Sequence, residues 1–132
     1  MTDINLIAVV VAGVAGFFVG GLWYSAKMFG SVWNRENGPH PHEAQKKHPA
    51  VAFVVSIALS IIAAGALAVW LGPRPELGQA ILKAALAGAC FVGTSFGINY
   101  QFAGRTNKLL LIDAGYHLSQ FTVFGLVLGL WH

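Results

Sequence analysis

An aspartate and a histidine lie four residues apart inside an apolar segment of this chain. The segment runs from Leu109 to the C-terminus, and Asp113 and His117 share one face of the helix that it predicts. Ionisable side chains inside a membrane span are costly, so they usually face a partner, a cavity or a pathway. A carboxylate can accept hydrogen bonds or hold a cation, and an imidazole can carry a proton near neutral pH. The pair is therefore the strongest candidate for a polar site.

Other polar side chains are expected near this pair. With a rise of about 1.5 Å per residue, Asp113 lies roughly 7 Å and His117 roughly 13 Å inward from Lys108. Two other apolar segments end at the same side in polar residues, so their side chains can converge with the pair. The predicted binding cluster comprises Tyr24, Asn99, Tyr100, Asp113, Tyr116 and His117.

Three interpretations of the pair are open. In a structural one, Asp113 pairs with Arg105 or Lys108 and accepts a tyrosine hydroxyl, and His117 is a neutral core residue with one hydrogen bond. In a functional one, Asp113 and His117 form a proton or solute site. A metal or haem site on His117 is the third, but no second membrane-embedded His or Cys lies at ligand spacing.

Catalysis by a Ser/His/Asp set is disfavoured because the sequence has no nucleophile elbow. The sequence thus favours a protein that is not an enzyme, and it identifies no cofactor.

The composition indicates a membrane protein. The 132 residues are 56% hydrophobic and 10% charged, whereas soluble domains average about 25% charged residues. A soluble chain this short could not bury so much apolar surface in one core, but lipid can cover it. The basic residues form no patch with base-stacking aromatics, which argues against a nucleic-acid partner. The single Cys90 excludes an internal disulfide.

Four apolar segments are long enough to cross a bilayer, which needs about 20 helical residues. Pro49 suits the first turn of the second segment, and Gly72 and Gly104 suit the ends of the second and third. The sequence therefore predicts an all-α, integral membrane four-helix bundle that forms one transmembrane domain over residues 1–132. The predicted spans are residues 4–25, 50–71, 77–103 and 109–131.

The predicted loop 26–48 contains a short amphipathic pattern. Met28, Phe29, Val32 and Trp33 recur at helical spacing, as in a short helix that lies in the membrane interface. Further along this loop, a weak metal site and a solvated polar stretch are both compatible with the sequence. The residues concerned are His40, His42, Glu43 and His48.

The basic residues predict the orientation. An even number of spans places both termini on one side, and most of the eight basic residues lie in the two loops on the other side. The positive-inside rule then places these loops in the cytoplasm and both termini outside or in the periplasm. The polar cluster is accordingly expected in the cytoplasmic half. The loop basic residues are Lys27, Arg35, Lys46, Lys47, Arg105 and Lys108.

Small residues predict close helix packing. They recur every fourth position in the first and third spans, and they line the face of the last span opposite Asp113. A last span with one polar and one small face should be packed on both sides, at the centre of the bundle or at a subunit interface. A homo-oligomer or a complex with other membrane subunits is therefore expected. The predicted packing glycines are Gly16, Gly20, Gly93, Gly97, Gly125 and Gly129.

Two stretches carry a resemblance to a known family. One is Gly21-Leu22-Trp23-Tyr24-Ser25 followed by Phe29-Gly30 and Trp33, and the other runs from Lys108 to Tyr116. Together they resemble a family of small bacterial membrane proteins known as domain of unknown function 1761. The resemblance covers nearly the whole chain and implies four transmembrane helices and a location in the bacterial envelope, where we expect the inner membrane. It implies no activity, and in that family Asn often stands where this chain has Asp113.

These observations favour a small non-enzymatic membrane protein that binds or moves a small solute or ion through a polar site in the cytoplasmic half. The alternative is an accessory subunit that docks a larger membrane complex through its small-residue helix faces. The size resembles that of the small multidrug exporters, but the first span lacks their membrane glutamate. This difference argues against a drug–proton antiporter.

Overall fold

The computed structural model describes residues 3–38 and 49–132, and every regular element in these ranges is helical. Four helical segments are long and apolar enough to cross a membrane, as predicted. Their bounds are α1 Leu6–Trp23, α3 Pro49–Leu71, a composite segment Leu77–Ala103, and α6 Asn107–Leu130. Each end lies within about two residues of the predicted one, consistent with the precision of such boundaries.

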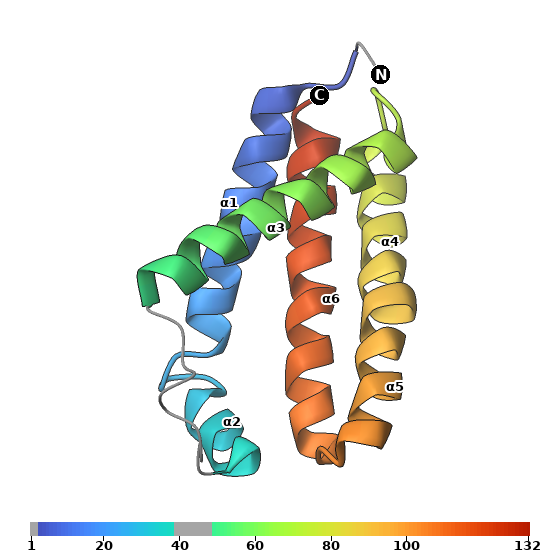
Figure 1. Cartoon of the computed structure of the whole chain (residues 1–132). Coiled ribbons are helices and arrows are strands. Elements are labelled where there is room, and N and C mark those ends of the chain that lie inside the picture. Colours follow the sequence, from blue (N-terminus) through green and yellow to red (C-terminus); the bar gives the residue numbers. More distant parts are fainter. Residues whose placement is uncertain (1–2, 39–48) are drawn as a thin grey trace.

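The last helix is the centre of the bundle. α6 contacts every other helical element of the described chain, whereas α3 packs mainly on α1. In Figure 1, α1, α6 and the composite segment run roughly side by side, and α3 crosses them obliquely. The central position that the two faces of the last span predicted is therefore found.

Both chain ends lie at the same end of the bundle in Figure 1, opposite the turn between α5 (Thr94–Ala103) and α6. We call the end that holds this turn and α2 the loop end. The short helix α2, Gly30–Asn37, is the predicted helix after the first span. It begins two residues after Met28, which remains exposed. The loop histidines proposed as a weak metal site lie outside the described residues.

The helix ends follow local sequence signals. α3 begins at Pro49, and Gly72 and Gly104 follow α3 and α5 with φ of 89° and 70°. That left-handed conformation costs glycine little, because glycine has no Cβ. Glu76 caps the next helix by accepting hydrogen bonds from the backbone N–H groups of Gly78 and Gln79. These bonds hold the pKa of Glu76 below its ordinary value.

The composite segment contains a break in α-helical geometry that the sequence did not reveal. It consists of α4 Leu77–Ala87, a π-helix η2 Gly88–Gly93, and α5 Thr94–Ala103. A π turn widens the helix and is frequently found at functional sites. Here η2 lies against α6 at His117, where a Cβ on Gly88 would come within 2.8 Å of the His117 carbonyl oxygen.

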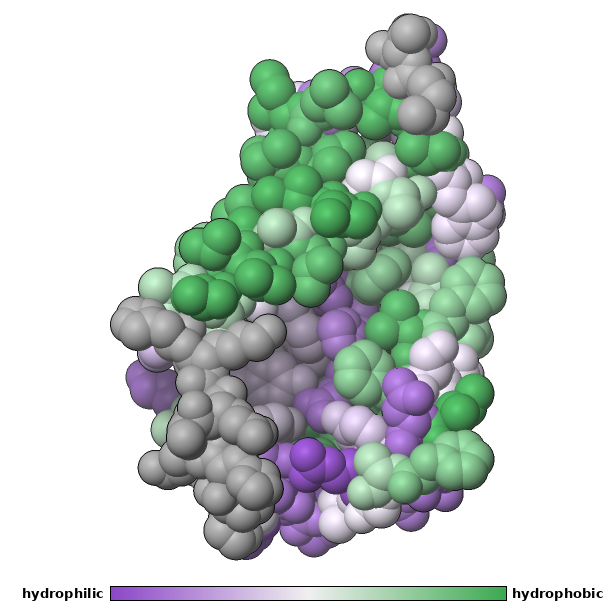
Figure 2. Space-filling view, viewed as in Figure 1, coloured by the Kyte–Doolittle hydropathy of each residue, from purple (hydrophilic) through white to green (hydrophobic). Residues whose placement is uncertain are grey.

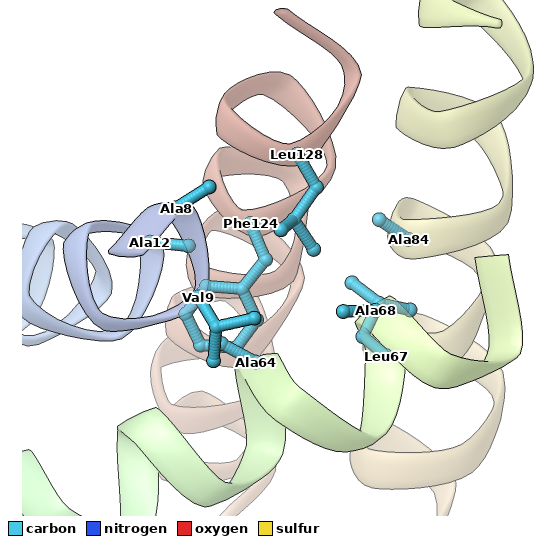
Figure 3. Close-up of a cluster of buried hydrophobic side chains, with 9 residues drawn as sticks. All are labelled: Ala8, Val9, Ala12, Ala64, Leu67, Ala68, Ala84, Phe124 and Leu128. Atoms are coloured by element: carbon cyan, nitrogen blue, oxygen red, sulfur yellow. The ribbon is translucent and has the colours of Figure 1, made fainter. Parts of the chain in front are cut away.

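The hydrophobic core is small and lies toward the terminal end. Figure 3 shows Phe124 and Leu128 of α6 between alanines of α1 and α3. Phe124 is fully buried because Gly16 leaves room for its ring, and a Cβ there would lie 2.5 Å from the ring. Many large apolar residues elsewhere are exposed, as expected where lipid is the solvent.

The predicted packing glycines differ in how tightly they pack. A Cβ on Gly16, Gly20, Gly125 or Gly129 would lie within about 3 Å of a neighbouring helix. At Gly97 it would meet only the Leu110 side chain, 3.8 Å away, and at Gly93 only ordinary contacts. Gly93 and Gly97 instead line an apolar hollow between this segment and α6.

Candidate functional site

Asp113 joins four elements at the loop end of the bundle. Its side chain is 7% exposed, and it accepts hydrogen bonds from three side chains that come from outside α6. The Tyr24 hydroxyl and the Trp33 indole N–H donate to Oδ1 at 2.5 and 3.0 Å. The Tyr100 hydroxyl donates to Oδ2. Asp113 thus links the end of α1, α2 and α5 to α6.

A tight turn after α1 brings the aromatic donors into place. The N–H groups of Met28 and Gly30 donate to the Ser25 carbonyl, and that of Phe29 donates to the Trp23 carbonyl. Gly30 is buried against the backbone of this turn. The Trp23 indole N–H donates to the Ile112 carbonyl at 2.9 Å, one residue before the carboxylate. The GLWYS, FG and W pattern therefore builds the hydrogen-bonding partners of α6.

The predicted ion pair of Asp113 is wrong. Arg105 donates instead to the Asn37 side-chain oxygen, with 2.5 Å between Nη1 and Oδ1. Arg105 and Lys108 are exposed, and among the described residues no cation lies within salt-bridge distance of Asp113. A charged head near a helix end can stay in the polar interface. Three neutral donors complete the solvation of the carboxylate in its place.

His117 belongs to a second hydrogen-bonded chain, one helical turn deeper. Its Nδ1 lies 2.8 Å from the Gln120 Oε1, and the Gln120 amide nitrogen donates to the Ser60 hydroxyl at 3.2 Å. The Ser60 hydroxyl donates to the Gly13 carbonyl at 2.7 Å. Gln120 and Ser60 are buried, so this chain crosses from α6 through α3 to α1.

The donor-to-acceptor direction of these hydrogen bonds determines the tautomer of His117. Ser60 has one hydroxyl proton and uses it on a carbonyl, so it must accept from Gln120. The amide oxygen then faces His117, and Nδ1 must carry a proton to donate to it. In the neutral ring, Nε2 therefore keeps its lone pair and can accept a proton or a hydrogen bond.

Two aromatic side chains pack against the His117 imidazole and hold it in place. Phe96 of α5 stacks on the imidazole, with 4.9 Å between ring centroids, and Tyr116 packs against it at 4.7 Å. The Tyr116 hydroxyl donates to the Gly16 carbonyl at 3.3 Å. Tyr116 also fills the space left by Gly20.

Both polar groups line hollows beneath α3. One hollow of about 570 Å³ contains Asp113, Tyr24 and Trp33, and one of about 320 Å³ contains His117, Gln120 and Ser60. A third, of about 340 Å³, shares Tyr24 with the first and Tyr116 with the second. Ser56 of α3 lines all three. Figure 2 shows the recess below α3, where the green apolar surface gives way to purple polar atoms.

The structure brings together most of the predicted binding residues but not all of them. Tyr24 and Tyr100 meet Asp113, and Tyr116 and His117 lie next to each other beneath α3. Asn99 is exposed on α5 and forms no hydrogen bond with these residues. Helical periodicity explains this, because Asn99 and Tyr100 are about 100° apart around the helix and only one can face α6.

The predicted site lacked several contributors, among them Trp33, Ser60 and Gln120. Trp33 was expected in the membrane interface, but it turns its indole N–H to Asp113. Ser60 lies in a run of apolar residues and carried no signal of its own. The only available signal for Trp33 was its position in the family-like pattern after the first span.

Within the described ranges, no three His, Cys, Asp or Glu side chains come close enough to hold a metal ion. Comparison with curated proteins and with solved structures gives no match. The model of one family matches residues 7–129, and its description reads "Protein of unknown function (DUF1761)". The match spans the turn after α1, the carboxylate and the last helix. The chain therefore belongs to the DUF1761 family.

Proposed function

We propose that this protein is a small non-enzymatic membrane protein that binds or moves a small solute or ion through the recess beneath α3. The observation that carries the proposal is the set of three adjacent hollows between Asp113 and His117, which share lining residues. Membrane proteins rarely retain ionisable and amide side chains in their spans unless these serve packing or a pathway. Here Asp113, His117 and Gln120 form hydrogen bonds within the protein and still line open hollows.

The proposed pathway lies in the cytoplasmic half of an inner membrane. The support is the placement of Lys27, Arg35, Arg105 and Lys108 at the loop end, where the positive-inside rule places the cytoplasm. Asp113 would stand near the cytoplasmic mouth, and His117 would stand deeper. The lone pair on Nε2 gives this deeper part an acceptor for a donor group on the solute.

The proposal requires water in the recess, and thiol labelling tests this. In a Cys90→Ala background, Ser56→Cys should react with a water-soluble thiosulfonate in purified membranes, because only the hydrated thiolate is a good nucleophile. Val54→Cys is the matched control, since Val54 is 67% exposed on the same helix but lines none of these hollows. A Ser56→Cys variant as unreactive as Val54→Cys would mean a dry recess and would rule the proposal out.

A second candidate is an accessory subunit of a larger membrane complex. The hollow between α5 and α6, about 430 Å³, favours it because small residues such as Gly93 and Gly97 line it. A transmembrane helix of another protein could pack there closely. Purification in mild detergent separates the two candidates. A subunit should leave the membrane with other chains in fixed ratio, whereas a solute-binding protein should emerge alone or as a homo-oligomer.

A further inference from the structure

We propose that the hollow at Asp113 selects a small organic ammonium ion, such as an alkylammonium or a quaternary ammonium. This inference rests on the proposed function and names the class of solute. It is carried by three features of the same hollow: one buried carboxylate, aromatic walls, and the absence of a cation among the described residues that line it.

The charge of the hollow points to a cation. Among the described residues that line this hollow, Asp113 is the only carboxylate, and none is a lysine, arginine or histidine. Arg105 donates a hydrogen bond to the Asn37 side chain, and both Arg105 and Lys108 are exposed. The Asp113 carboxylate is itself buried, and a charge partly surrounded by protein attracts a cation more strongly than a charge in bulk water does. An anion would be repelled by this carboxylate, and the described lining residues offer it no positive group.

The carboxylate keeps capacity for a ligand. Two ionised carboxylate oxygens offer about four lone-pair positions, and Tyr24, Trp33 and Tyr100 use three of them. An ammonium N–H could take the position that remains. A quaternary ammonium, which has no N–H, would instead approach through charge alone.

The walls suit the apolar part of such an ion. Tyr24, Trp33 and Phe53 line the hollow, and the first two pack edge to face at 5.9 Å. Aromatic rings attract ammonium groups through their quadrupoles, and tryptophan does so best. A metal cation would instead require several oxygen ligands, and Asp113 is the only carboxylate among the described lining residues. The hollow thus matches an ion that carries its charge on an alkylated nitrogen.

Paired probes of equal shape test this class. The thermal unfolding of the purified protein should be measured with choline and with 3,3-dimethylbutan-1-ol, which replaces the ammonium nitrogen by carbon. Choline should stabilise the protein, and the neutral alcohol should not. Asp113→Asn should weaken choline binding about tenfold or more, because it keeps the shape and removes the charge.

A second pair of variants tests the same inference in case Asp113→Asn does not fold. Ser56 is exposed, so Ser56→Lys should fold and place its own ammonium in the hollow. It should abolish the choline effect, whereas Ser56→Met, of similar length and neutral, should keep it. Tetramethylammonium and ethylammonium serve as further probes of the same class.

The outcomes separate this inference from the function on which it rests. Equal stabilisation by choline and the alcohol, or a choline effect that survives Asp113→Asn or Ser56→Lys, would overturn the cation class. If choline, tetramethylammonium and ethylammonium all fail to change the thermal unfolding, the cation class is overturned as well. In each of these cases, a reactive Ser56→Cys variant would still support the solute pathway. An unreactive Ser56→Cys variant would rule out both the pathway and the ammonium class of solute.

Discussion

At the scale of single residues, the site consists of two polar groups that the fold satisfies in different ways. Asp113 is satisfied by donors from three other elements, so it stabilises the loop end of the bundle. His117 is held by one bond and two rings, and its second nitrogen remains available. A buried carboxylate with three hydrogen bonds suits a structural role as well as a binding role. The histidine is the freer of the two.

Removal of one donor from Asp113 tests its structural role. Trp33→Phe deletes the indole N–H while retaining an aromatic ring, and it should lower the free energy of unfolding by about 1.5–3 kcal/mol, as for hydrogen bonds to charged groups. Thermal unfolding in detergent is the measurement. Trp70→Phe is the control, because Trp70 is 52% exposed on α3 and far from the carboxylate in sequence and contacts. Equal losses in the two variants would mean that the bond to Asp113 contributes nothing.

Ser60 offers a matched comparison within the membrane. Ser60→Ala leaves the buried Gln120 amide without its acceptor, so we expect a loss of about 1–3 kcal/mol in chemical or thermal unfolding. Ser119→Ala should change stability by less than about 0.5 kcal/mol, because that hydroxyl only donates to the Gly115 carbonyl of its own helix. If Ser60→Ala lowers stability no more than Ser119→Ala does, the Gln120 amide nitrogen does not depend on Ser60 as its acceptor, and the inferred direction of the hydrogen bonds is wrong.

At the scale of elements, close approach to α6 determines the site. Gly125 lets the α4 backbone come so near that a Cβ would lie 2.6 Å from the Ala80 carbonyl oxygen. Beyond this contact, η2 widens the helix beside His117, and α5 then carries Tyr100 to Asp113 and leaves the apolar hollow at Gly97. The π-helix therefore sets which α5 residues reach the site.

Single methyl groups test this packing. Gly125→Ala should destabilise the protein by about 1–3 kcal/mol through overpacking against backbone. Gly21→Ala, where a Cβ would meet nothing within 4 Å, should be neutral or stabilising by about 0.5–1 kcal/mol, because alanine favours the helix. Unfolding transitions of the two purified variants give the comparison. A neutral Gly125→Ala would show that α4 can move away from α6 without cost.

At the scale of the whole molecule, the four membrane-length helices enclose only a small hydrophobic core. Most large apolar side chains are exposed, so lipid supplies the apolar surroundings. Both ends of the chain lie together, and the polar recess opens toward the loop end. This asymmetry makes the orientation in the membrane testable.

We expect the loop end in the cytoplasm. In a Cys90→Ala background and intact cells, Ser31→Cys on α2 should resist an impermeant thiol reagent, and His132→Cys should react. The reason is the concentration of basic residues at the loop end. Labelling after the membrane is permeabilised is the control that both thiols are accessible. The opposite pattern in intact cells would reverse the orientation, and with it the side on which Asp113 meets water.

The sequence alone determined the membrane-spanning helices and the general position of the polar site. Apolar length determines the spans, because a bilayer needs about 20 apolar residues per helix. Helical periodicity placed Asp113, Tyr116 and His117 on one face of the last helix, and the segment ends placed Tyr24 and Tyr100 near them. These are local properties, which the order of residues along one chain encodes directly.

Only the tertiary structure decided how the polar groups are satisfied. Whether Asp113 meets Arg105 or three neutral donors depends on the turn after α1 and on η2, which bring Trp33 and Tyr100 to it from distant positions. The π-helix has no sequence signature, and Ser60 becomes polar support only because α3 crosses α1 at Gly13. Hydrogen bonding and open volume arise between helices, and no single helix encodes them.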